Sequence, residues 1–144
     1  MTRFAEIEVG DAIETAGRTI TEADIANFAG VSGDFNHLHT NAERMRASEF
    51  GERIAHGALV FSIATGLLWQ VRERPSHVVA FYGIDRLRFV SPVFVGDTIS
   101  VRAEVAGKDS REHPVASGVV RYDVTVSNGE DETVLSCELL SLVR

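Results

Sequence analysis

The 144-residue sequence has a single cysteine, Cys137, so the chain cannot form an internal disulfide bond. A chain without disulfides is compatible with a reducing compartment, which predicts a cytoplasmic location. The sequence also lacks any cluster of lysines and arginines, and its formal net charge of −7 comes from 21 acidic against 14 basic residues. Because nucleic-acid binding requires basic groups gathered to neutralise phosphates, we expect no nucleic-acid partner.

Long apolar runs are absent as well. The longest one covers residues 58–69 and is interrupted by Ser62, Thr65 and Gly66. A membrane-spanning helix needs about 20 apolar residues, so this run is too short. Residues 1–10 contain one basic residue and no apolar stretch, which is not the pattern of a secretory signal. We therefore expect a soluble protein with no membrane contact.

The composition that remains is ordinary for a folded protein, with 44% apolar and 24% charged residues. A chain of this length fits one domain and buries roughly two thirds of the surface that it exposes when unfolded. No internal repeat or linker interrupts it. We predict a single domain over residues 1–144.

The first half of the chain has helical patterns. Thr21 and Asp24 form a capping pair, and apolar residues then recur at helical spacing, so a short helix is predicted over residues 22–29, ending at Gly30. Thr40 or Asn41 can cap a second short helix that runs to about residue 47.

A third helix is predicted over residues 58–71. Its apolar residues cover nearly every side, so we expect it to be wrapped by the rest of the protein and closed by Pro75. This helix is the predicted centre of the core.

The second half of the chain changes to the alternation of β-strands. Four strands are predicted over residues 78–90, 98–105, 119–127 and 133–143, after an extended arm over residues 12–20 that Gly17 interrupts. Turn signals at Gly96-Asp97 and Asn128-Gly129 favour antiparallel pairing of sequential strands. Helices followed by strands indicate an α+β fold in which an antiparallel sheet curls around the apolar helix.

The polar residues of the chain gather in one short stretch, Ser32 to His39. It contains the carboxylate of Asp34, the amide of Asn36 and the imidazoles of His37 and His39. A loop can turn Asp34 and His39 into one cleft, where a carboxylate and an imidazole together can activate a water molecule.

Three motifs, in this order, carry a resemblance to a known family: GDFNHLH at residues 33–39, HGAL at residues 56–59 and RFVSPVFVGD at residues 88–97. Together they resemble the MaoC-like, or (R)-specific enoyl-CoA hydratase (hydratase 2), branch of the hot-dog superfamily. The first motif is the specific one, and the resemblance covers most of the chain. The sequence departs from the usual pattern at His37, where the family has proline, so the loop loses some rigidity and substrate choice is expected to differ.

The resemblance implies a hot-dog fold, a homodimer or dimer of dimers whose sheets join, and acyl-CoA thioesters bound beside the dimer interface. It implies hydration of trans-2-enoyl-CoA to (R)-3-hydroxyacyl-CoA, or the reverse dehydration, on thioesters of CoA or acyl carrier protein. It implies no metal and no redox cofactor.

The expected catalytic residues are Asp34 and His39, which hold the water, and Gly57, which begins the apolar helix. Free backbone N–H groups at that helix start can stabilise the oxyanion that forms on the thioester. Asn36 and Ser62 are expected to support the site, Asn36 by holding the loop and Ser62 by a hydrogen bond near the thioester.

Each residue also has a purely structural interpretation. Asp34 can form an Asx turn, and His39 can be a loop histidine whose hydrogen bonds are satisfied. Asn36 can stabilise a turn, Gly57 can simply start the helix, and Ser62 can bond back to a helix carbonyl. His56 is expected to shape the turn before the helix.

Other reactive side chains are expected to stay outside the chemistry. Arg86 and Arg88 can meet CoA phosphates or lie on a solvated strand face. Cys137 is expected to be a small apolar residue and not a nucleophile.

Two other functions remain open from the sequence. One is a hot-dog thioesterase, which would direct water at the thioester carbon. The other is a non-catalytic subunit that binds acyl thioesters or supports another hot-dog chain.

Overall fold

The computed structural model describes residues 3–72 and 76–144. Among these residues the elements are η1 (Phe4–Glu6), β1 (Ala12–Glu14), β2 (Arg18–Thr19), α1 (Glu22–Ser32), α2 (His37–Thr40), α3 (Ala42–Arg46), α4 (Gly57–Val71), β3 (Val78–Phe89), β4 (Thr98–Ser110), β5 (Gly118–Ser127) and β6 (Thr133–Val143). The chain is therefore α+β, with helices followed by strands, as the sequence predicts. The predicted helix stop at Pro75 lies outside the described residues.

The strands form one antiparallel sheet in the order β1-β4-β5-β6-β3, and β2 pairs with β4 beside it. The predicted hairpin around Asn128 forms and joins β5 to β6. The prediction of sequential pairing is wrong for β3, which pairs with β6 instead of β4. The chain after β3 forms a bridge between Phe94 and Ile54. This bridge carries it away from β3, which is left at the edge of the sheet.

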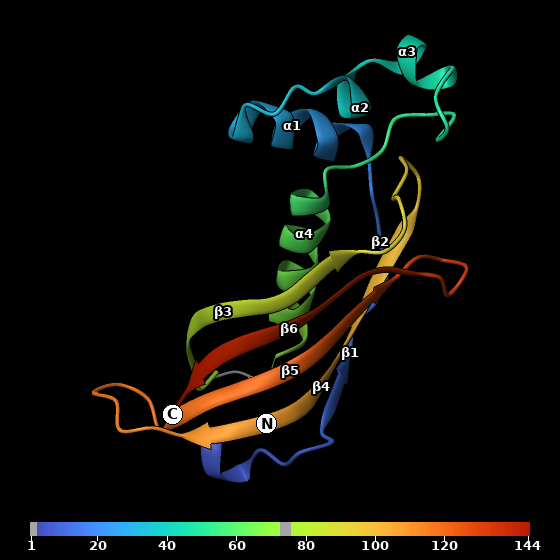
Figure 1. The fold of residues 1–144 in the computed structure, drawn as a ribbon. Coiled ribbons are helices and arrows are strands. Elements are labelled where there is room, and N and C mark those ends of the chain that lie inside the picture. The colour runs from blue at the N-terminus through green and yellow to red at the C-terminus, as the bar shows by residue number, and fades with distance from the viewer. Residues whose placement is uncertain (1–2, 73–75) are drawn as a thin grey trace.

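Helix α4 lies against one face of the sheet (Figure 1). The inward-facing residues of the central strands alternate with outward-facing ones, and those of β5 are Val120, Tyr122, Val124 and Val126. The sheet packs against α4 as predicted, but one side of the helix is exposed, so the prediction that the helix is wrapped on nearly every side is wrong for a single chain. Trp69 is 50% exposed, because the sheet covers only one side of the helix.

The first predicted helix is longer than expected. Thr21 and Asp24 form the predicted capping box, but α1 continues through Gly30 to Ser32. It ends because Gly33 takes a left-handed conformation with φ of 75°, which glycine adopts without steric cost. The backbone N–H of Gly33 donates to the carbonyl of Ala29 and closes the last turn.

Two short helices follow. The predicted loop around His39 contains a single helical turn, α2, and the predicted second helix is α3, capped by Asn41. Helices α1, α2 and α3 gather beyond the N-terminal end of α4 (Figure 1). Within the part of the chain that the structure describes, none of the helices has the length and apolar character required to span a membrane.

Candidate active site

Asp34 lies between the end of α1 and the start of α2. Its Oδ1 accepts the backbone N–H of Asn36 at 3.2 Å, which is the predicted Asx turn. Its Oδ2 is left free to face His39. The structural interpretation of Asp34 is confirmed, and it is compatible with the functional one, since each uses a different oxygen.

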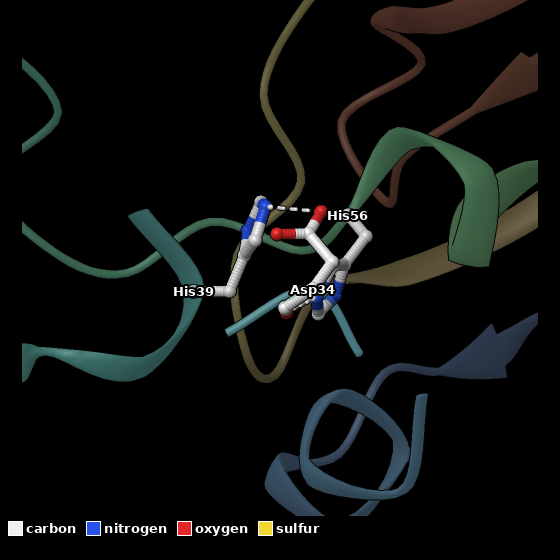
Figure 2. Close-up of side chains that lie close together, drawn as sticks. All are labelled: Asp34, His39 and His56. Carbon is white, nitrogen blue, oxygen red and sulfur yellow. Dashed lines mark hydrogen bonds and ion pairs between the residues drawn. The ribbon is translucent and has the colours of Figure 1, made fainter. Parts of the chain in front are cut away.

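His39 is held on the opposite side by a backbone contact. Its Nδ1 lies 2.7 Å from the carbonyl oxygen of Ile54, and the residue is only 8% exposed. A carbonyl only accepts hydrogen bonds, so the neutral ring carries its proton on Nδ1 and keeps the lone pair on Nε2. That Nε2 lies 3.9 Å from Oδ2 of Asp34, across the gap marked in Figure 2. This separation is too long for a direct hydrogen bond and suits a small polar molecule between the two atoms.

His56 has a larger role than the sequence suggests. It is 2% exposed, and its Nε2 lies 3.0 Å from the backbone carbonyl of Asp34, to which it donates. Its ring stacks on that of His39, with centroids 3.7 Å apart, and meets the edge of Phe28. His56 thus touches both of the residues that face the gap (Figure 2). The histidine before Gly57 in the HGAL motif is the sequence signal that points to it.

Asp34, His39 and His56 each offer a ligand atom within 4.8 Å of the others. Each imidazole donates one ring N–H to a backbone carbonyl and keeps a lone pair on its other nitrogen, and the ring planes lie 28° apart in a stack. Metal ligation uses the lone pair in the plane of each ring, and stacked rings direct these lone pairs side by side rather than at one point. The stacking therefore argues against one metal ion bound by both rings.

Gly57 is the first residue of α4, next to His56. Among the described residues no side chain caps this end of the helix, so its first N–H groups are available to a ligand. A Cβ atom at position 57 would lie 2.7 Å from the ring of Phe89, so glycine allows the ring to approach the helix start. His39, Gly57 and Phe89 all line one cavity of 370 Å³.

The two supporting residues behave differently. Asn36 caps α2 by accepting the N–H of Leu38 at 3.0 Å, and so holds the turn that carries His39. Ser62 donates to the carbonyl of Ala58 at 2.8 Å and does not line the cavity that contains His39. The structure thus brings Asn36 to the site and leaves Ser62 outside it. A serine hydroxyl within a helix readily donates to a carbonyl one turn earlier in the same helix.

His37 and the two arginines lie apart from the gap. His37 starts α2 and is half-buried beside a second cavity that Arg44 and Phe50 also line. Arg86 forms an ion pair with Glu138 at 2.6 Å, and Arg88 donates to the carbonyl of Leu87. Both arginines thus have partners within the fold.

Cys137 lies on β6 and is buried, as predicted. Burial raises the pKa of its thiol to about 11, so the reactive thiolate is scarce at pH 8. We expect the native protein to react with a disulfide reagent such as DTNB roughly a hundredfold more slowly than the unfolded chain. The rate in the native state should still rise between pH 8 and 10. Complete labelling within seconds at pH 8 would contradict this prediction.

Comparisons with known proteins identify the family. A model of the MaoC like domain matches residues 4–128. The chain belongs to the MaoC-like domain family. Its architecture is the predicted hot-dog fold, an antiparallel sheet packed against a long helix.

Three similar proteins define this relationship. The chain is 48% identical over 101 residues to Protein MaoC of Klebsiella aerogenes, which is 69% of this chain but only 29% of that protein. It is 36% identical over 104 residues to an (R)-specific enoyl-CoA hydratase of Rhodospirillum rubrum, covering 72% of this chain and 69% of the relative. The solved structure of a monoamine oxidase regulatory protein from Archaeoglobus has a TM-score of 0.92 at 43% identity, over 99% of this chain and 94% of that one.

Proposed function

We propose that the protein is an (R)-specific hydratase that adds water to trans-2-enoyl-CoA and gives (R)-3-hydroxyacyl-CoA, or runs the reverse dehydration. One observation carries the proposal: Asp34 Oδ2 and His39 Nε2 face each other across 3.9 Å. The name of the Rhodospirillum relative supports the substrate class and the stereochemistry. The reaction neither oxidises nor reduces the substrate, so it requires no redox cofactor.

The gap between the two side chains is where the water would bind. Asp34 Oδ2 would accept one of its hydrogens and His39 Nε2 the other. As the water oxygen attacks Cβ of the enoyl group, Nε2 takes the proton, and the imidazolium is stabilised by the nearby carboxylate. The same Nε2–H then gives a proton to Cα, so that a hydrogen and a hydroxyl have been added and both residues return to their starting state.

The attack on Cβ moves negative charge onto the thioester oxygen. The uncapped start of α4 offers N–H groups and the positive end of the helix dipole to that oxygen. Gly57 lines the same cavity as His39, so a thioester carbonyl can reach this helix start while its Cβ lies near the gap. Asp34, His39 and the N–H groups at the start of α4 are the three groups that the proposed reaction uses.

The test is incubation of the purified protein with crotonyl-CoA, with chiral analysis of the products. The proposal expects loss of enoyl absorbance and formation of (R)-3-hydroxybutyryl-CoA. Release of free CoA without the hydroxyacyl product would instead identify a thioesterase. Binding without any turnover would identify a non-catalytic acyl-thioester binder.

The exposed edge of β3 leads to a proposal about assembly. Phe81 and Tyr82 on this edge strand are each about half exposed. Proteins rarely leave a long edge strand with large apolar side chains open to solvent. We propose that a second copy of the chain pairs with it and forms a homodimer.

We therefore expect Phe81→Glu to weaken the dimer at least about tenfold, because it places a charge in an apolar contact. Sedimentation velocity over a range of protein concentrations measures this change. Phe81→Leu is the matched control and should stay dimeric. A wild-type protein that sediments as a monomer at high concentration would overturn the assembly.

A further inference from the structure

A different cavity, separate from those beside His39 and His37, lies along α4 away from the catalytic gap. Gly57, Phe61 and Thr65 are spaced four residues apart, so they lie on one face of the helix, and Arg72 follows two turns later. The cavity has a volume of 450 Å³ and runs between this face and β3. Its described lining is mostly apolar: Phe61, Leu68, Trp69, Val78, Val79, Ala80, Phe81 and Leu139, with Thr65, Arg72 and Ser141 as the polar side chains.

Arg72 is the only charged side chain among the described residues that line this cavity. It is half-buried, and the described residue that interacts electrostatically with its guanidinium is Tyr122. Burial lowers the pKa of its guanidinium. Burial also raises the pKa of the Tyr122 hydroxyl, so this neighbour carries no negative charge near pH 7. An anion in the cavity would therefore be stabilised beside the partly desolvated guanidinium of Arg72.

Ser141 is the second polar group in the cavity. It belongs to the inward-facing row of β6, where its neighbours Leu139 and Val143 are apolar, and it is only 1% exposed. Its hydroxyl is a buried polar group in the lining, and it can donate a hydrogen bond to an acceptor atom of a ligand.

The opposite side of Arg72 is less favourable for an anion. There a cavity of 570 Å³ is also lined by Glu6 and Asp11. Asp11 accepts the N–H of Glu8 at 2.9 Å. An anion would therefore approach Arg72 from the apolar cavity beside α4, where no described carboxylate opposes it.

We propose that Arg72 and Ser141 bind a carboxylate at the far end of the acyl group, so that the preferred substrates are enoyl thioesters that end in a carboxylate and not in a methyl group. This inference rests on the proposed hydratase function. Arg72 directly follows the end of α4, 15 residues after Gly57, so the helix separates the two by about 22 Å, and the arginine side chain shortens the remaining distance. The cavity thus suits acyl chains of medium length.

The test compares matched trans-2-enoyl-CoA pairs, from six to fourteen carbons, that differ only in a terminal carboxylate or methyl group. We expect kcat/KM to favour the carboxylate at least tenfold at the best length. Arg72→Met should lower kcat/KM for the carboxylate substrate by ten- to a hundredfold. The kcat/KM for the methyl substrate should stay within about twofold of the wild-type value. Ser141→Ala should act in the same direction with a smaller effect. Arg102→Met, on an exposed part of β4, is the matched control and should change kcat/KM for neither substrate.

Two further arms separate other sources of the anion. If Arg72 binds a CoA phosphate, Arg72→Met weakens every CoA thioester alike and leaves pantetheine thioesters unaffected, which would overturn the proposal. If Arg72 pairs with a second copy of the chain, Arg72→Met dissociates the dimer in sedimentation, which would overturn it too.

Calorimetry with saturated ω-carboxyacyl-CoA and acyl-CoA measures binding without turnover. Preferential binding of the carboxylate form supports the binding of a terminal carboxylate by Arg72 and Ser141 even if no hydration occurs. In that case only the proposed function fails. Equal binding of the two forms, together with normal hydration of crotonyl-CoA, refutes the proposed carboxylate site and leaves the proposed function intact.

Discussion

Asp34→Asn should lower the turnover of crotonyl-CoA at least about a hundredfold, the usual scale for removing an acid–base group. The amide keeps an oxygen that can accept the N–H of Asn36, so the turn around residue 34 is preserved. What is lost is the negative charge 3.9 Å from Nε2 of His39. Turnover is measured by the loss of enoyl absorbance, and the melting temperature shows whether the fold is intact.

His39→Asn is the companion change. Its amide can still donate to the carbonyl of Ile54, but it has no atom at the position of Nε2. We expect a loss of similar size, and the double variant should be little worse than either single one, because the two groups act on one water. Asp123→Asn and His113→Gln, which lie on β5 and in an exposed loop, serve as controls. Near-normal turnover in both Asp34→Asn and His39→Asn would make the mechanism untenable.

His56→Phe should lower kcat by about ten- to a hundredfold with little change in KM. The phenyl ring can keep the stack on His39, but it cannot donate to the carbonyl of Asp34. Small displacements of a catalytic group can cost a hundredfold in rate, and Asp34 is the group that this bond positions. Steady-state kinetics on crotonyl-CoA separates kcat from KM.

The control for His56→Phe is His56→Gln, whose amide can donate to the same carbonyl. It should recover a large part of kcat. Because His56→Phe leaves a backbone carbonyl without its partner, we also expect it to lower the free energy of unfolding by about 1–3 kcal/mol in urea titrations. Equal kcat in the two variants would show that the bond to Asp34 does not position the site.

The polar motif could be recognised from the sequence because its structure is local. The capping box of Thr21 and Asp24, the turn at Asp34 and the cap by Asn36 each join groups two or three residues apart. Short-range bonds of this kind depend on residue type and spacing, which the sequence displays directly. Of the two interpretations of Ser62, the structure shows the local one, a hydrogen bond back to the carbonyl of Ala58 in the same helix.

The sequence by itself determined the α+β class, the strand positions and the pairing of Asp34 with His39. These features depend on periodicity and on hydrogen bonds between residues that are close together in the sequence. Only the tertiary structure decided the tautomer of His39, set by Ile54 15 residues away, and the role of His56, set by a carbonyl 22 residues away. It also decided that β3 pairs with β6, and that Arg72 and Ser141 line one cavity. Such contacts depend on how separate elements pack, and no local pattern encodes that packing.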